Sequence, residues 1–267
     1  MIVFPNAKIN IGLHVVSKRT DGYHNLETVF YPVQLTDALE MAESKEEKFT
    51  ASGISMDSLP EDNLVMKALH LLRKDFELPP VQFHLHKIIP FGAGLGGGSS
   101  DAAFTLKILN DYFSLHLKNE ELKRYAAQLG ADCAFFIENK PAFAKGTGDQ
   151  LQPVDLDLSK YQVVVLKPQL SVSTIEAYKN IEPKSPDFNL VDLPQLPLEE
   201  WKNTVVNDFE KNIFSKYPEI KFLKEKLYEL GAAYASMSGS GSAVFGIFRH
   251  LPTDFDNLIP QGIFIYR

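Results

Sequence analysis

The sequence predicts an α+β protein of two domains, and three observations lead to this fold class. Short segments in which apolar and polar residues alternate predict strands. Helical patterns with one apolar face lie between them. The pattern then starts again near residue 155 of the 267 residues, a length that allows two small domains. We therefore expect a first domain over residues 1–155 and a second over residues 156–267.

The first domain is expected to begin with strands and to continue with helices. Strands are predicted over residues 7–15, 23–31 and 81–87. Helices are predicted over residues 62–76, after Asp101, and over about 119–129. Asp62 or Asn63 can cap the first of these helices, and Gly130 is expected to end the last one in a left-handed conformation.

The second domain repeats this mixture in another order. Strands are predicted over residues 161–166, 232–237 and 243–248, with a Ser-Gly loop between the last two. A helix is predicted over residues 218–230, because proline stands in its first turn and Gly231 follows its end. Residues 181–200 carry four prolines and are expected to be irregular.

Composition excludes several classes of protein. No apolar run approaches the roughly 18 residues that span a bilayer, and the N-terminus does not resemble a signal peptide, so we expect a soluble cytoplasmic protein without a membrane partner. The single cysteine, Cys133, allows neither an intrachain disulfide nor a cysteine-based zinc site, and no metal-ligating residues are predicted. The net charge of −7 argues against general nucleic-acid binding.

A glycine-rich loop lies between the strand at 81–87 and the helix that follows. Glycine permits positive φ and a close backbone approach to a ligand. The unpaired N–H groups and the positive end of the helix dipole favour an anion, above all a di- or triphosphate. The residues predicted to bind it are Gly92, Ala93, Gly94, Leu95, Gly96, Gly97, Gly98, Ser99 and Ser100.

Other interpretations of this loop are weaker. It is no Walker A motif, because Ser99 and Ser100 stand where Lys-Ser/Thr would be required. The spacing Gly92-x-Gly94-x-x-Gly97 fits a dinucleotide-binding fingerprint only by chance, since the acidic residue at the next strand end is missing. A flexible turn remains the structural alternative.

Three polar residues outside the loop fit phosphoryl transfer to an alcohol. Such a reaction needs cationic stabilisation of the phosphoryl group, Mg²⁺ and an aligned acceptor. Asp132 is one acid within an otherwise apolar stretch, and Lys8 and Asn10 share the polar face of the first strand. Simpler interpretations are an N-cap for Asp132 and a solvated strand face for Lys8 and Asn10.

The motif at 90–103 resembles the phosphate-binding motif of the GHMP kinases. Residues 5–13 and 130–132 resemble two further motifs of that family, although Cys133-Ala134 replaces the common Val-Pro. The resemblance implies the two-domain GHMP kinase fold, with ATP and substrate in the inter-domain cleft, and the cofactors ATP and Mg²⁺. It makes Asp132 the candidate catalytic base, which either takes the hydroxyl proton or stabilises the alcohol beside a cation, and it makes Lys8 the cationic partner.

The resemblance also suggests two further ATP contacts, each with a simpler alternative. Lys87 precedes the glycine loop and could reach ATP, or it could be a solvated strand end. Asn63 matches a family asparagine near the nucleotide, or it could simply cap a helix.

Three stretches, residues 19–30, 146–149 and 238–246, resemble the branch of this family that acts on a cytidine diphosphate-linked methylerythritol. A cytosine ring needs a flat aromatic partner and hydrogen bonds to its edge. Tyr23 and Tyr178 are expected to sandwich it, with His24 pairing with the base. The alternatives are a packed hairpin aromatic for Tyr23 and helix packing for Tyr178. The predicted substrate-binding residues are Asn10, Tyr23, His24, Asp132, Thr174, Tyr178 and Gly239.

The implied reaction moves the γ-phosphoryl group of ATP to the 2-hydroxyl of this substrate in the non-mevalonate isoprenoid precursor pathway. One alternative is another GHMP kinase, of the homoserine or mevalonate type. The other is an inactive nucleotide-binding regulator, although Lys8, Asp132 and the complete glycine loop argue against it.

Overall fold

The computed structural model describes residues 1–55, 60–179 and 181–267. It divides into two compact units that are interleaved along the chain. Unit 1 comprises Met1–Lys8, Pro32–Phe91 and Gly96–Lys140; unit 2 comprises Ile9–Tyr31, Gly92–Leu95 and Pro141–Arg267. The sequence placed a single boundary at residue 155, whereas the chain passes between the units several times.

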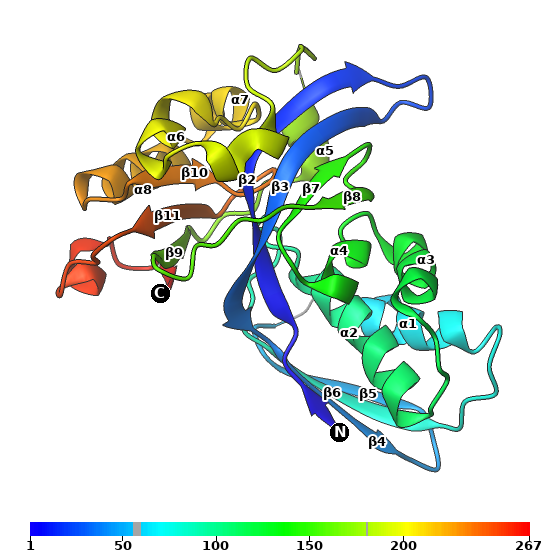
Figure 1. Ribbon diagram of the computed structural model, residues 1–267. Helices are drawn as coiled ribbons and strands as arrows, with labels where there is room; N and C mark the ends of the chain where they lie inside the picture. Colours follow the sequence, from blue (N-terminus) through cyan, green and yellow to red (C-terminus); the bar gives the residue numbers. More distant parts are fainter. Residues whose placement is uncertain (56–59, 180) are drawn as a thin grey trace. The chain divides into compact units, whose positions relative to one another are not determined.

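Unit 1 is a four-stranded sheet with helices packed on one face (Figure 1). The strand order is β1-β4-β6-β5, in which β6 pairs antiparallel with β4 and parallel with β5. The elements are β1 (Ile2–Val3), β4 (Ala38–Glu43), β5 (Lys48–Gly53), η1 (Pro60–Asp62), α1 (Leu64–Leu72), β6 (Val81–Lys87), α2 (Gly97–Tyr112), α3 (Asn119–Leu129) and α4 (Cys133–Glu138). Alternate residues of β6 are buried, so one face of this sheet meets the helices and the other meets solvent.

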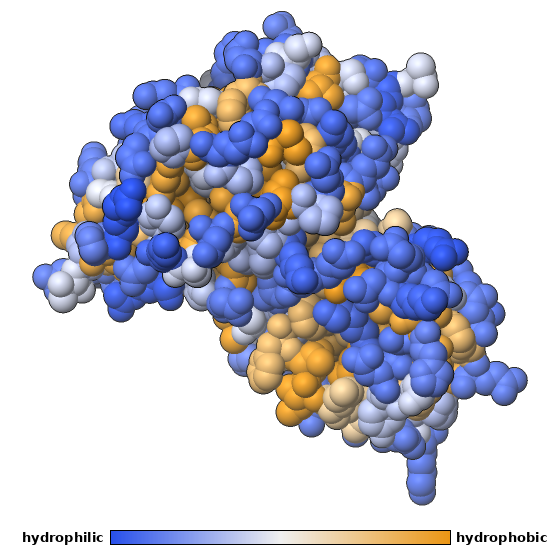
Figure 2. Space-filling view, in the orientation of Figure 1, coloured by the Kyte–Doolittle hydropathy of each residue, from blue (hydrophilic) through white to orange (hydrophobic). Residues whose placement is uncertain are grey.

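Helix α3 packs on the other helices of unit 1 and turns its polar side outward. Only Leu122 and Ala126 are buried in it, and Figure 2 shows mainly hydrophilic side chains over this helix. Its predicted bounds are confirmed. Gly130, however, has φ 172° and ψ 155°, which is extended backbone, so the expected left-handed conformation is wrong.

Unit 2 contains a second sheet of order β10-β11-β9-β12 and most of a third, β2-β3-β7-β8. The strands are β2 (Asn6–Lys18), β3 (His24–Thr36), β7 (Ala142–Lys145), β8 (Gln150–Pro153), β9 (Gln162–Lys167), β10 (Tyr234–Met237), β11 (Val244–Phe248) and β12 (Phe264–Tyr266). The helices are α5 (Thr174–Tyr178), η2 (Leu190–Gln195), α6 (Leu198–Thr204), α7 (Glu210–Lys216), α8 (Pro218–Glu229) and η3 (Phe255–Leu258).

The core of unit 2 joins β2 to the second sheet. Leu13 and Val15 of β2 pack with Val164 of β9 and Leu223 of α8 in one buried apolar cluster. Burial of this apolar surface fixes β2, and with it the polar residues that alternate with Leu13. Residues 181–200 are less irregular than expected, because η2 and the start of α6 lie within them.

Within residues 1–55, 60–179 and 181–267, no helix has the length and apolarity needed to cross a membrane.

Candidate active site

The two candidate catalytic residues lie side by side in unit 1. Lys8 Nζ of β2 is 3.2 Å from Asp132 Oδ2, just before α4. The Lys8 side chain is 4% exposed and that of Asp132 31% exposed. The carboxylate is therefore open to a ligand, and the ammonium is held behind it. A solvated strand face is wrong for Lys8, and Asp132 stands at the N-cap of α4 without a side-chain capping hydrogen bond.

The first half of the glycine loop, residues 92–95, belongs to unit 2. Gly92 and Gly94 have φ values of +57° and +73°. A Cβ atom on Gly94 would lie 2.0 Å from the carbonyl oxygen of Ser238, so only glycine fits there. The hydroxyl of Ser238 donates a hydrogen bond to the carbonyl oxygen of Gly94 at 2.8 Å.

The second half of the loop begins helix α2 in unit 1. Gly96, at φ +70°, is the N-cap and brings no side chain to the helix start. A Cβ atom there would lie 3.2 Å from Cε of Lys8. The N-terminus of α2, where the helix dipole favours anions, therefore lies directly beside the Lys8–Asp132 pair.

Ser99 and Ser100 follow in the first turn of α2. A Cβ atom on Gly130 would lie 3.3 Å from Sγ of Cys133 and 3.8 Å from Oγ of Ser99. Ser99 thus lies against the turn that carries Asp132. The Ser100 hydroxyl is buried and has no hydrogen-bond partner among the described residues. Burial raises the pKa of Cys133 to about 12, so this thiol is no nucleophile at neutral pH.

Lys87 is buried beneath the first turn of α2. Its side chain is 1% exposed, and its ammonium pairs with Asp37 and, at 2.7 Å, with Asp101. Nζ would be 3.0 Å from a Cβ atom on Gly97. The alternative of a solvated strand end is therefore wrong, whereas contact with ATP stays a prediction.

The two carboxylates around Lys87 differ in their surroundings. Asp37 accepts hydrogen bonds from the backbone N–H groups of Ile88 and Ile89, at 2.6 and 2.8 Å. Asp101 Oδ1 has no hydrogen-bond partner among the described residues. Burial, opposed by Lys87 and reinforced by Asp37, raises the pKa of Asp101 to about 7.

Asn63 caps α1, as its alternative interpretation predicted. Its side-chain oxygen accepts from the backbone N–H of Val65 at 2.9 Å. A contact with ATP stays a prediction for this residue.

In unit 2, Asn10 and Gly239 lie close together. A Cβ atom on Gly239 would be 3.2 Å from Asn10 Oδ1, and Asn10 Nδ2 donates to Thr28 Oγ1 at 3.1 Å. The backbone N–H of Asn10 donates to Ser238 Oγ at 3.2 Å. Asn10 is 3% exposed, so the solvated strand face is wrong here too.

Tyr178, which was expected to enclose the cytosine ring together with Tyr23, contacts His24 and Phe209. The His24 ring stacks on Tyr178, with centroids 4.8 Å apart and planes at 19°. Tyr178 also meets the edge of Phe209 at 4.8 Å, so it takes part in packing as its alternative predicted. Tyr23 is 65% exposed and so is not packed on the hairpin rim. Thr174 is exposed at the start of α5.

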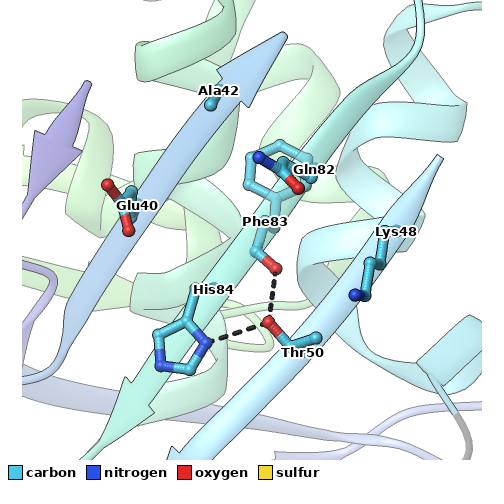
Figure 3. A pocket seen from close by; sticks show the side chains of 7 residues that line it. All are labelled: Glu40, Ala42, Lys48, Thr50, Gln82, Phe83 and His84. Carbon is cyan, nitrogen blue, oxygen red and sulfur yellow. Dashed lines mark hydrogen bonds between the residues drawn. The ribbon is translucent and has the colours of Figure 1, made fainter. Parts of the chain in front are cut away.

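A shallow depression on the outer face of the unit 1 sheet contains none of the predicted residues. Figure 3 shows its lining on β4, β5 and β6, where Thr50 Oγ1 donates to the carbonyl of Phe83 at 3.2 Å and lies 2.9 Å from His84 Nδ1. Both contacts involve Thr50, and the depression lies on a solvent-facing sheet surface.

Comparison with known proteins identifies the family. The model of the GHMP kinase N-terminal domain matches residues 63–140, and that of the C-terminal domain matches residues 192–254. The 4-diphosphocytidyl-2-C-methyl-D-erythritol kinase of Bacteroides fragilis (strain YCH46) is 57% identical over 252 residues, which cover 93% of this chain and 92% of that protein. This chain belongs to the 4-diphosphocytidyl-2-C-methyl-D-erythritol kinase family of GHMP kinases.

Solved structures agree with this family. A crystal structure of a 4-(cytidine 5'-diphospho)-2C-methyl-D-erythritol kinase matches with a TM-score of 0.80 and 33% identity, over 92% of this chain and 90% of that chain. A homoserine kinase from Cytophaga hutchinsonii matches with a TM-score of 0.66 and 18% identity, over 98% and 94% of the two chains. The second likeness shows the shared GHMP kinase fold alone.

Several polar residues that support these sites were not predicted. Asp37 and Asp101 hold Lys87, and Ser238 and Thr28 hold Asn10. Ser238 stands in a motif recognised from the sequence, so its position beside Gly239 was the available signal. Asp101 likewise stands in the motif at 90–103, whereas Asp37 carries no such signal, because its pairing with Lys87 depends on a residue fifty positions away.

Proposed function

We propose that this chain transfers the γ-phosphoryl group of ATP to the 2-hydroxyl of 4-diphosphocytidyl-2-C-methyl-D-erythritol, a step of the non-mevalonate isoprenoid precursor pathway. Family membership supports the activity. The observation that carries the mechanism is the Lys8–Asp132 contact of 3.2 Å beside the N-terminus of α2. A phosphate-binding helix start and an acid–ammonium pair are two of the parts that phosphoryl transfer to an alcohol requires.

The start of α2 binds the triphosphate in this proposal. The glycines at 92, 94 and 96 take positive φ, and the helix N-terminus presents N–H groups to the phosphates. Ser99 and Ser100 add hydroxyl groups. Asn63, which caps α1, and Lys87 are proposed to lie near the nucleotide; the charge of the buried Lys87 ammonium is offset by Asp37 and Asp101.

A magnesium ion fits this site through an oxygen donor of the chain. In nucleotide sites Mg²⁺ is held mainly by phosphate oxygens, with few protein ligands. The buried Ser100 hydroxyl, which lacks a hydrogen-bond partner among the described residues, is a suitable donor in the right turn. The bound ion would neutralise charge on the β- and γ-phosphates.

Asp132 acts on the acceptor hydroxyl. Its partly exposed carboxylate accepts the hydroxyl proton as the new P–O bond forms and the bond to the ADP oxygen breaks. The Lys8 ammonium at 3.2 Å orients that carboxylate and offsets the negative charge that gathers around the transferred group.

The cytidyl end of the substrate is recognised in unit 2. Tyr23 and Tyr178 are proposed to enclose the cytosine ring, and His24, whose ring stacks on Tyr178, is proposed to pair with the base. Asn10, Thr174 and Gly239 complete the acceptor contacts. We also infer a cytoplasmic location.

A substrate panel tests this function. The purified chain with ATP and Mg²⁺ is offered the cytidyl substrate, homoserine or mevalonate, and phosphorylated product is measured. We expect product from the cytidyl substrate alone. Preference for homoserine or mevalonate would refute the assigned substrate, and nucleotide binding without any turnover would identify an inactive regulator.

A further inference from the structure

A short segment of unit 2, residues 207–210, lies beside β2 just after α6. The N–H of Leu13 donates to the carbonyl of Val206, and the N–H of Asp208 donates to the carbonyl of Leu13, both at 2.9 Å. These two bonds fix the segment three residues beyond Asn10 along the strand.

Asn207 uses its whole amide group to hold the Ser-Gly loop after β10. Its Nδ2 donates to the carbonyl oxygens of Met237 and Gly239, both at 2.9 Å, and its Oδ1 accepts from the N–H of Phe209 at 3.0 Å. Asn207 is 3% exposed. The carbonyl oxygens of the two residues that flank Ser238 are thus tied to a single buried nitrogen.

The Ser238 side chain connects this loop to two parts of the proposed site, the backbone at Gly94 and the backbone at Asn10. Its hydroxyl donates to the carbonyl of Gly94 at 2.8 Å and accepts from the N–H of Asn10 at 3.2 Å. Ser238 is fully buried. A displacement of the peptides around Ser238 would therefore move Gly239 and disturb Asn10.

The three residues after Asn207 hold other parts of the same region. Asp208 accepts from the N–H of Val15 at 2.8 Å, and Glu210 accepts from the N–H of Met237 at 2.8 Å. Phe209 is buried against Tyr178 with ring planes at 78°. Each member of this segment therefore contacts a strand, loop or ring of the proposed acceptor site.

We propose that Asn207 is a positioning residue for the cytidyl substrate: it fixes the peptides around Ser238 so that Asn10 and Gly239 keep the places in which they bind the acceptor. This inference rests on the proposed function, because it takes Asn10 and Gly239 as acceptor contacts. Asn207 itself does not touch the reacting atoms in this account.

The nearly isosteric variant Asn207→Asp tests the proposal. The carboxylate keeps an acceptor for the N–H of Phe209 but turns a second oxygen toward the carbonyls of Met237 and Gly239. A buried carboxylate oxygen repels the two carbonyl oxygens, which also lose their hydrogen-bond donor. The backbone that carries these carbonyls is therefore expected to shift. We expect acceptor affinity, measured by calorimetry without ATP, to fall about tenfold or more.

Comparing the affinity for ATP with the affinity for the acceptor shows whether Asn207→Asp disturbs the acceptor contacts alone or damages the whole protein. Residues 96–100 belong to unit 1, whereas Ser238 also holds Gly94 of the phosphate-binding loop, so we expect Asn207→Asp to weaken ATP binding several-fold less than it weakens acceptor binding. The matched control is Asn203→Asp, an exposed position on α6 with the same charge change, which should leave both affinities unchanged. Equal loss for ATP and acceptor, or unchanged acceptor binding, would overturn the proposal.

A double variant tests whether Asn207 acts through Ser238. Ser238→Ala removes the hydroxyl that joins Gly94 and Asn10, and combined with Asn207→Asp it should weaken acceptor binding no further than the stronger single change. Full additivity would contradict the proposed route. Should Asn207→Asp not fold, Asn207→Ala removes the amide without adding a charge, and the same selective loss is expected.

These measurements distinguish the inference from the proposed function. Acceptor binding is measured without ATP, so a failure of phosphoryl transfer would count against Lys8 and Asp132 and leave the Asn207 result unaffected. A wild-type chain that did not bind the cytidyl substrate would refute the proposed function and this inference together.

Discussion

Replacing the buried lysine beneath the helix start, Lys87→Met, should strongly destabilise unit 1. The ammonium is 1% exposed and serves two carboxylates, Asp37 and Asp101, which are 0% and 4% exposed. Methionine fills a similar volume but leaves both acids buried without a cation. Breaking a buried ion pair by removing one partner costs about 3–5 kcal/mol, so we expect a loss of that size at pH 8.

The stability lost in Lys87→Met should depend on pH, and the raised pKa of Asp101 decides whether that loss grows or shrinks as pH rises. Burial raises this pKa from 3.8 to about 7, so the folded state holds a proton that the unfolded state has released. The contribution of Asp101 to stability therefore falls as pH rises from about 4 to 7 and then levels off. Without the lysine the pKa of Asp101 should rise further, so the deficit of Lys87→Met should grow between pH 6 and pH 8.

Denaturant unfolding followed by circular dichroism measures both effects. The single tryptophan, Trp201, lies in unit 2, so its fluorescence reports separately on that unit. The control is Lys123→Met, whose partly exposed ammonium pairs with Glu120 and Glu138 and should cost about 1 kcal/mol or less. A Lys87→Met loss no larger than the control, or one that shrinks toward pH 8, would refute the reasoning.

Two other predictions concern the loop and the thiol. Gly94→Ala should reduce turnover about tenfold or more, because its Cβ would lie 2.0 Å from the carbonyl of Ser238. Gly231→Ala, at φ +96° with no atom within 4 Å of its Cβ, should cost about 1 kcal/mol in unfolding and leave turnover unchanged. Equal turnover in the two variants would contradict the steric argument. Cys133, whose pKa burial raises to about 12, should react with a thiol reagent at pH 8 only after denaturation, and rapid labelling of the native protein would contradict its burial.

Local sequence patterns predicted the elements that carry the site. The strict alternation around Lys8 gave β2, and alternation over 81–87 gave the bounds of β6. The glycine loop and the serines after it located the start of α2. These predictions succeeded because period-2 alternation and helix-start chemistry are local properties of the chain.

Other features depend on contacts between distant residues and could not be found locally. The short strands β4 and β5 are defined by their pairing with β6, and the interleaved units depend on how β2 and β3 pass between them. Lys87 was expected at a solvated strand end or near ATP, because no local pattern shows that Asp37, fifty residues away, meets it. Asn207 was missed for the same reason, since its partners lie thirty residues further along.

The most direct test of the catalytic account is the turnover of Asp132→Asn with ATP and the cytidyl substrate. This change keeps the shape beside Lys8 but removes the group that accepts the hydroxyl proton. We expect kcat to fall about 10²-fold or more with ATP affinity unchanged, while the exposed control Asp111→Asn keeps full turnover. A kcat for Asp132→Asn close to that of the control would contradict the role of the Lys8–Asp132 pair.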